Sequence, residues 1–158
     1  MIQNISFKEA GKEDVNSIFL LIKGCFDKYV AVDYKEEGIQ EFYKHINPAN
    51  LLMRIKEGYY TFIALMDGTI IGVIQFKEAH HISLFFVAKE YQGKGIGKAL
   101  FESSLKGYIL KNNHHDLITV NSTPIAVKFY EKIGFRRTMF EQTKNGIIYT
   151  PMELILLE

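Results

Sequence analysis

Three glycines in five positions, Gly93, Gly95 and Gly97, follow an apolar stretch of the chain and precede a segment with helical periodicity. A strand, a glycine loop and a helix in this order can bind an anion, because glycines have no Cβ atom to keep a ligand away from backbone N–H groups. The first N–H groups of the helix have no partner within it, and the positive end of the helix dipole lies at the same place. We therefore expect this loop to bind a phosphate group.

Two familiar phosphate loops do not match these residues. The Rossmann pattern G-x-G-x-x-G requires glycine where Lys98 stands, and the P-loop pattern requires glycine at Gln92 and Ser or Thr at Ala99. The spacing that does fit is Gln-x-x-Gly-x-Gly, at Gln92, Gly95 and Gly97. Taken alone, so short a pattern is equally explained by a glycine-rich turn that caps a helix.

A second motif lies about thirty residues further on, and its defining positions are Ala126, Phe129, Tyr130, Gly134 and Phe135. On its own, an adjacent Phe and Tyr on a helix is explained by core packing. The two motifs together, in this order and at this separation, resemble the two signatures of the GNAT superfamily of coenzyme A-dependent N-acetyltransferases. The predicted order of elements along the whole chain is also similar to the GNAT fold.

The resemblance implies a binding site for acetyl coenzyme A. Backbone groups of Phe85, Phe86 and Val87 would contact the pantetheine arm, which lies beside the strand like an added strand. The pyrophosphate would be surrounded by Gln92, Gly93, Lys94, Gly95, Ile96, Gly97 and Lys98. Further contacts are implied for Asn121, Thr123, Phe129 and Tyr130, although the family usually has Asn where this chain has Thr123.

The reaction implied by the resemblance is transfer of an acetyl group to a primary amine of a small molecule or peptide, by direct attack in a ternary complex. Tyr130 resembles the general acid that protonates the leaving thiolate. An amine with a pKa of about 10.4 is protonated at pH 7, and removing its proton costs about 4.6 kcal/mol. A base or a water relay is therefore needed. His81 is the candidate for this role, and Glu78, His80 and Ser83 are alternatives.

The acceptor pocket in such proteins is built from the first helices, their connection and the last hairpin. The resemblance therefore implies that the acceptor contacts Phe26, Tyr29, Tyr34 and Tyr149. A second function, of a different class, is a sensor or interaction module that binds acetyl coenzyme A without transferring the acetyl group. No metal is expected, because side chains of the adjacent His80 and His81 would point to opposite faces of a strand and no third ligand is evident.

Hydrophobic periodicity predicts the elements that position these residues. Helices are expected at residues 13–27, 39–46, 48–58, 96–111 and 124–133, with an aromatic-rich connection at 28–34. Strands are expected at residues 2–8, 59–66, 69–76, 82–87, 117–121, 135–143 and 147–157. Because a helix connects them, the strands at 82–87 and 117–121 should run parallel and splay apart in the GNAT manner. The fold class is thus α/β (α+β), a mixed and mostly antiparallel sheet of about six or seven strands with one splayed parallel pair, flanked by helices.

Composition limits the remaining choices. The 158 residues suit one N-acetyltransferase domain over residues 1–158, with 47% hydrophobic and 23% charged residues. A net charge of +1 gives no electrostatic reason to expect a nucleic acid or membrane partner. Cys25 is the only cysteine, so an internal disulfide is excluded. The sequence shows no signal-peptide pattern or membrane span, so a cytoplasmic location is expected, and the protein is expected to be either a monomer or a homodimer.

Overall fold

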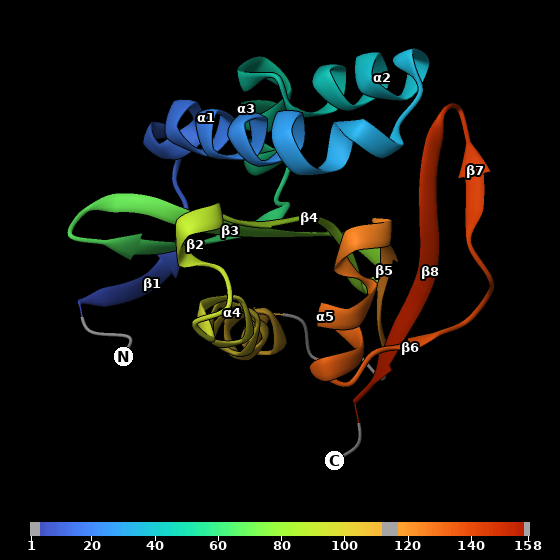
Figure 1. The fold of residues 1–158 in the computed structure, drawn as a ribbon. Coiled ribbons are helices and arrows are strands. Elements are labelled where there is room, and N and C mark those ends of the chain that lie inside the picture. The colour runs from blue at the N-terminus through green and yellow to red at the C-terminus, as the bar shows by residue number, and fades with distance from the viewer. Residues whose placement is uncertain (1–3, 112–116, 157–158) are drawn as a thin grey trace.

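The core of the protein is a mixed sheet whose strands follow the order β1-β2-β3-β4-β5-β8-β6, with β7 paired to β8 (Figure 1). The computed structural model describes residues 4–111 and 117–156. The strands are β1 (Ile5–Glu9), β2 (Tyr60–Met66), β3 (Thr69–Lys77), β4 (His81–Val87), β5 (Leu117–Ser122), β6 (Arg136–Arg137), β7 (Gln142–Lys144) and β8 (Ile147–Ile155). Only β4 and β5 are parallel among these neighbours. The predicted fold class is confirmed, with eight strands in place of six or seven.

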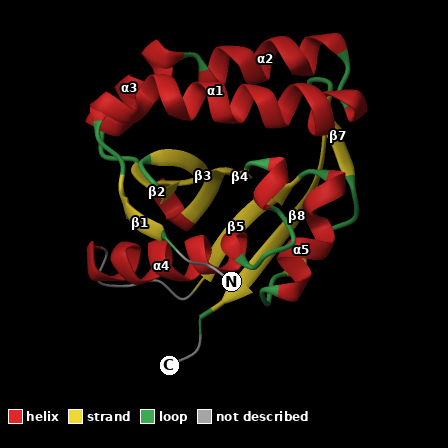
Figure 2. Ribbon diagram, turned by 60° about the vertical axis from the view of Figure 1, so that its left-hand side comes forward, coloured by secondary structure: helices red, strands yellow, loops and turns green. Residues whose placement is uncertain are grey.

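The helices form a layer on each face of the sheet (Figure 2). They are α1 (Val15–Cys25), α2 (Glu36–Ile46), α3 (Pro48–Lys56), α4 (Ile96–Lys111) and α5 (Val127–Lys132). Helices α1, α2 and α3 lie on one side, and α4 and α5 lie on the other (Figure 1). The predicted connection at 28–34 is largely helical, with a π-helical turn at Phe26–Val30 and a 3-10 turn at Ala31–Asp33.

Strand β3 shows why the sheet needs both layers. Its six residues from Ile71 to Phe76 are all buried. Val73 packs in the core beneath α1 to α3, whereas Ile74 packs in the core against α4 and α5. A run of buried residues in which only Gln75 is polar is typical of a strand that is covered on both faces.

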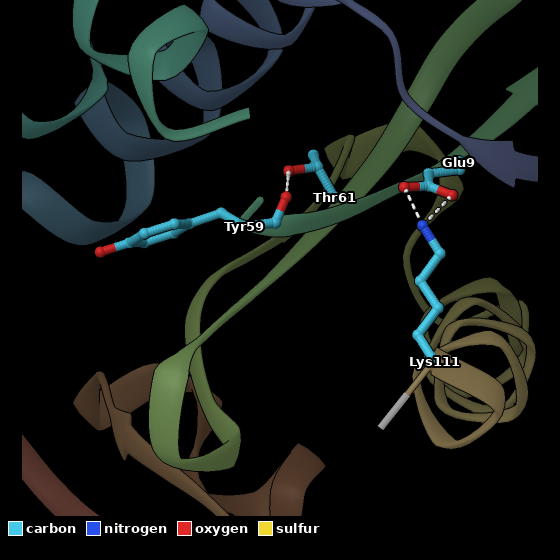
Figure 3. Close-up of polar contacts among 4 residues, drawn as sticks. All are labelled: Glu9, Tyr59, Thr61 and Lys111. Carbon is cyan, nitrogen blue, oxygen red and sulfur yellow. Dashed lines mark hydrogen bonds and ion pairs between the residues drawn. The ribbon is translucent and has the colours of Figure 1, made fainter. Parts of the chain in front are cut away.

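An ion pair fixes the end of α4 to the edge of the sheet. Lys111 Nζ lies 2.8 Å from both carboxylate oxygens of Glu9 on β1 (Figure 3). Both side chains are about half exposed, so the pair contributes little to stability and mainly marks where α4 crosses the edge.

The predicted strand at 135–143 is wrong in its middle. Only Arg136–Arg137 and Gln142–Lys144 are strand, and the side chains of Met139 and Phe140 between them are exposed. The ladder ends where Thr138 N–H donates to the carbonyl of Pro151 at 3.0 Å. Pro151 has no N–H to return, so the ladder is interrupted here and pairing to β8 resumes only at Gln142 with Tyr149. The outer ends of the predicted strands at 2–8 and 147–157 lie outside the described residues.

The start of α2 touches the turn between β7 and β8. Lys35 N–H donates to Gly146 O at 3.1 Å, and a Cβ atom added to Gly38 would lie 2.5 Å from that oxygen. Glycine at position 38 is therefore required by the close approach of a helix to a hairpin backbone. This contact joins the helical layer to the C-terminal hairpin.

Gly38→Ala is expected to destabilise the protein by about 1–3 kcal/mol, because the added methyl group must push α2 away from the hairpin. Gly24→Ala is the matched control, since Gly24 also lies in a helix but has open space around its Cβ position. That change should stabilise the protein by about 0.5–1 kcal/mol through helix propensity. Urea unfolding of both variants measures the two signs, and equal effects at the two positions would contradict the close contact.

Candidate active site

The two parallel strands are hydrogen-bonded neighbours over only two residue pairs. His81 pairs with Thr119 and Ile82 pairs with Val120, after which the strands separate. From Ser83 to Val87, β4 therefore has β3 on one side and no paired strand on the other among the described residues. The predicted splay between the parallel strands is confirmed, and it leaves an open edge of β4 in the middle of the sheet.

The backbone direction at the end of β4 identifies the groups on this open edge. Ala88 N–H donates to Ile71 O at 2.8 Å, so the peptide groups of Ala88 point toward β3. Backbone groups alternate sides along a strand, so those of Phe86 also point to β3, and those of Phe85 and Val87 point into the gap. Of the three residues predicted to contact an extended ligand through the backbone, two are directed toward the gap.

The carbonyl of Val87 already has partners. It accepts a hydrogen bond from Gln92 Nε2 at 2.8 Å and one from the thiol of Cys25 at 3.5 Å. Gln92 therefore ties the start of the glycine loop to the end of β4. Burial, with a smaller contribution from Glu90, raises the pKa of the Cys25 thiol, so it stays protonated and can donate.

The glycine loop has the backbone that its sequence predicts. Gly93 and Gly95 have φ angles of +75° and +81°, which favour glycine. Gly95 O accepts the first helical hydrogen bond, from Ala99 N–H at 3.0 Å, so the N–H groups just before Ala99 have no acceptor within α4. A Cβ atom on Gly97 would lie 3.0 Å from the Phe129 ring, so Gly97 lets α5 pack against the start of α4.

Lysines beside the loop add positive charge. Lys94 Nζ lies 5.7 Å from the centre of the Tyr91 ring, and Lys98 Nζ lies 3.9 Å from a carboxylate oxygen of Glu102. Both lysines are exposed. Open backbone donors, a helix start and two exposed cations are the groups that bind a phosphate.

Tyr130 lies under the gap, inside an aromatic cluster. Its ring centre is 6.0 Å from that of Phe85, 5.5 Å from Phe129 and 5.2 Å from Phe135. The side chain is only 5% exposed, and its hydroxyl has no hydrogen-bond partner in the described part of the chain. Burial raises the pKa of Tyr130 well above its ordinary value, so the hydroxyl stays protonated. Burying a hydroxyl without a hydrogen-bond partner costs free energy, unless a ligand supplies the partner.

Two predicted cofactor residues lie where β5 ends. Asn121 is exposed on β5 opposite Pro151 of β8. Thr123 precedes a short 3-10 turn, and its carbonyl accepts from Ser122 Oγ at 2.8 Å and from Ala126 N–H at 3.1 Å. Neither side chain has a hydrogen bond to another described residue that would fix it away from the gap.

The residues predicted to bind the acceptor are in different environments. Phe26 is fully buried and stacks on Phe42 with 4.0 Å between ring centres, so its ring exposes no surface to a ligand. Tyr34 packs edge-on against Phe26, and burial raises its pKa to about 12. Tyr29 lies beneath Lys89 Nζ at 5.0 Å. Tyr149, on β8, donates its hydroxyl to Gln142 at 3.3 Å.

His81 lies where β4 and β5 are still paired. Its Nδ1 atom is 2.8 Å from Thr119 Oγ1 across the two strands. Burial, helped by the charge of Lys77, lowers the pKa of His81 to about 4. The imidazole is thus neutral at pH 7, but it binds a proton much more weakly than an ordinary histidine.

A buried polar cluster next to the gap was not predicted from sequence. It joins Arg54 on α3 to Gln75 on β3 and to Ser83 on β4. The only signal in the sequence is a single Gln within the apolar run from Ile70 to Phe76. Its partners lie far along the chain, so periodicity could not reveal them.

The described residues contain no group of three or more metal-ligating side chains. They also contain no helix with the length and apolar character needed to cross a bilayer. The site therefore consists of an open strand edge, a glycine loop with exposed amides and a buried hydroxyl. It fits a long ligand that has amide groups along its arm and a phosphate at one end.

Comparison with known proteins identifies the family of the chain. The family model described as acetyltransferase (GNAT) domain matches residues 30–156. N-alpha-acetyltransferase 30 of Schizosaccharomyces pombe is 30% identical over 89 residues, an alignment that covers 49% of this chain and 58% of the relative. The chain thus spans little more than half of that relative.

Solved structures of low sequence identity share the fold. A GCN5-related N-acetyltransferase from Rhodopseudomonas palustris has a TM-score of 0.80 and 21% identity, covering 99% of this chain and 98% of its own. The PaiA N-acetyltransferase of Thermoplasma acidophilum, in complex with coenzyme A, has a TM-score of 0.79 and 23% identity, covering 96% and 99%. A phosphinothricin acetyltransferase from Sinorhizobium meliloti, in complex with acetyl-CoA, has a TM-score of 0.74 and 20% identity, covering 98% and 89%.

The family model covers most of the chain, including the splayed strands, the glycine loop and Tyr130. By this match, the chain belongs to the GNAT family of acetyltransferases.

Proposed function

We propose that the protein is an N-acetyltransferase that transfers the acetyl group of acetyl-CoA to a primary amine, by direct attack in a ternary complex. The observation that carries the proposal is the buried hydroxyl of Tyr130, which has no partner in the described chain and lies beside the open edge of β4. A group of this kind can donate a proton to a leaving group that enters the gap.

The residues around the gap would hold the donor in three places. Backbone groups of Phe85 and Val87 would bond the pantetheine arm, with Phe129 packing beside it. The open N–H groups at residues 93–98, with Lys94 and Lys98 nearby, would hold the pyrophosphate. Asn121 and Thr123 at the end of β5 would contact the arm from the opposite strand.

Acetyl-CoA supplies an activated thioester. Tyr130 would keep its proton on Oη until a thiolate needs it, because burial raises its pKa and disfavours the tyrosinate. The rings of Phe85, Phe129 and Phe135 exclude water from this hydroxyl and hold it in one position. Proton donation from an oriented group of this kind contributes a factor of about 10²–10⁴ in rate.

The acceptor would enter between the connection that follows α1 and the β7–β8 hairpin, where Tyr29, Tyr34 and Tyr149 lie. Among the similar proteins, one is named as an N-alpha-acetyltransferase and another as a phosphinothricin acetyltransferase. We therefore propose either a peptide amine or a small-molecule amine as acceptor. His81 is the base proposed from sequence, although its low pKa leaves it a weak proton acceptor.

A sensor that binds acetyl-CoA without turnover is the alternative function. The two functions are separated by measuring coenzyme A release from acetyl-CoA in the presence of a panel of amino acids, polyamines and short peptides. Turnover with any acceptor supports the enzyme. Thermal stabilisation by acetyl-CoA with no release on any acceptor would support the sensor.

Tyr130→Phe is expected to lower kcat by about 10²-fold while changing the affinity for acetyl-CoA less than twofold, because only the proton donor is removed. Tyr60→Phe is the matched control, since Tyr60 is also a buried tyrosine but lies on β2 away from the gap. Steady-state kinetics and calorimetry measure the two quantities. Full activity of Tyr130→Phe would remove this hydroxyl from the reaction.

Gly95→Glu is expected to weaken binding of acetyl-CoA at least tenfold, because it places a carboxylate and a strained backbone in the phosphate loop. Gly68→Glu is the control: Gly68 has nearly the same φ angle, +82°, but lies in the turn between β2 and β3. Both changes should cost similar stability. Equal affinity of the two variants, measured by calorimetry, would show that the loop does not hold the phosphate.

A further inference from the structure

Four polar side chains form a hydrogen-bonded chain beneath α3, in an otherwise apolar layer. Arg54 Nε donates to Gln75 Oε1 at 3.3 Å, and Ser83 Oγ lies 3.0 Å from the same oxygen. Gln75 Nε2 donates to Thr61 Oγ1 at 3.0 Å, and the Thr61 hydroxyl donates to Tyr59 O at 3.3 Å (Figure 3). Gln75 is 0% exposed, Thr61 2% and Arg54 7%.

The chemistry of these partners fixes the direction of the Ser83 proton. A guanidinium can only donate, so the amide atom that faces Arg54 must be the oxygen of Gln75. An amide oxygen can only accept, and so can the main-chain carbonyl of Gln75, which lies 3.4 Å from Ser83 Oγ; with either partner, Ser83 donates its single proton to Gln75. The lone pairs of Ser83 Oγ are therefore left to accept a hydrogen bond from another molecule.

Ser83 occupies a special position on β4. Gln75 pairs with Leu84 and Phe76 pairs with Ile82, so Ser83 is the extra residue of a β-bulge. It is also the first residue beyond the last parallel pair, Ile82 with Val120, and so stands at the apex of the gap. Its hydroxyl is on the side of α3, opposite the side where Phe85 meets Tyr130.

The guanidinium of Arg54 carries a charge that no carboxylate balances by direct contact among the described residues. Its other hydrogen bond goes from Nη2 to the carbonyl of His45 on α2. The charged and titratable groups nearby are His45, Glu57 and Tyr59, and Lys77 lies near both His45 and His81. Burial, with smaller contributions from Arg54 and Lys77, lowers the pKa of His45 to about 4.

We propose that Ser83 Oγ accepts a hydrogen bond from the acceptor amine, and that the buried cation of Arg54, held by Gln75, favours the neutral form of that amine. The proposal rests on the proposed N-acetyltransferase function and adds the way in which the acceptor is positioned and deprotonated. Ser83 touches the substrate, whereas Gln75 and Arg54 are positioning residues that act through it.

The proposal accounts for proton removal without a strong side-chain base. A neighbouring positive charge disfavours an ammonium ion, as it does in lysines activated as nucleophiles. At an effective dielectric constant of about 20, a unit charge 8–10 Å away lowers the pKa of an amine by roughly 1 to 1.5 units. The proton then passes to water before attack, and His81 needs no high proton affinity.

Gln75→Glu tests the charge without emptying the site. The carboxylate keeps an oxygen for Arg54 and for Ser83, and the Thr61 hydroxyl can turn to donate to its second oxygen. The negative charge of the new carboxylate balances the positive charge of the guanidinium, so the pKa of the bound amine should rise. The rising limb of the plot of kcat against pH should therefore shift to higher pH by roughly 1 unit. The profile is measured between pH 6 and 10 with saturating acetyl-CoA and the amine that gave the fastest turnover in the panel. An unchanged limb would overturn the role of Arg54.

Ser83→Ala tests the contact with the acceptor. It should raise KM for the amine about tenfold by removing one hydrogen bond, with the affinity for acetyl-CoA unchanged. Thr61→Val is the structural control, because it breaks the other end of the chain and should lower the melting temperature with no shift in the pH profile. An unchanged KM in Ser83→Ala, or an equal pH shift in Thr61→Val, would overturn the proposal.

The same measurements separate this inference from the proposed function. If the wild-type protein shows no turnover on any amine, the N-acetyltransferase function fails and the inference fails with it. If the wild type turns over and Tyr130→Phe is impaired, but Ser83→Ala and Gln75→Glu behave as wild type, only the inference fails.

Discussion

The separation of β4 from β5 after two residue pairs is the constraint on which the rest of the site depends. Each strand is paired on its other edge, β4 with β3 over six residue pairs interrupted by the bulge at Ser83, and β5 with β8 over six residue pairs. Each half of the sheet thus has its own ladder, and only two residue pairs join the halves. An unpaired strand edge in a protein interior is costly unless something completes its hydrogen bonds. The architecture therefore creates a binding edge at the centre of the molecule.

The two faces of the sheet present different side chains at this gap. On the side of α4 and α5, Phe85 meets Phe129 and Tyr130 in an apolar cluster that can surround a thioester. On the side of α3, the bulge at Ser83 meets Gln75 and Arg54 in a polar cluster that can receive an amine. A thioester and an amine can thus approach β4 from opposite faces of the sheet.

Local patterns predicted the parts of this site that lie close together in sequence. The glycine loop, the flanking parallel strands and the helix bearing Tyr130 could be read from spacing, because turn chemistry and periodicity act over a few residues. The strand predicted at 135–143 failed in its middle because Pro151, on the neighbouring strand β8, interrupts the ladder at Thr138, and the periodicity of one strand does not show this. Phe26 looked like a pocket wall, yet packing against Phe42 buries it completely. The cluster of Arg54 and Gln75 was missed because its partners come from α3, β3 and β4.

The energetics of that cluster favour a functional origin. Replacing buried polar or ionic groups by well-packed apolar residues is often neutral or stabilising, so such groups give weak evidence of a role in stability. Here Leu or Met at positions 54 and 75 would continue the surrounding core of Ile63, Val73 and Leu84. Within the described residues, the buried cation of Arg54 has no carboxylate in direct contact, and Gln75 Oε1 accepts from both Arg54 and Ser83. The Ser83 hydroxyl can still accept a hydrogen bond at the point where β4 and β5 separate. A ligand that donates a hydrogen bond there best explains the cluster, and under the proposed function this ligand is the acceptor amine.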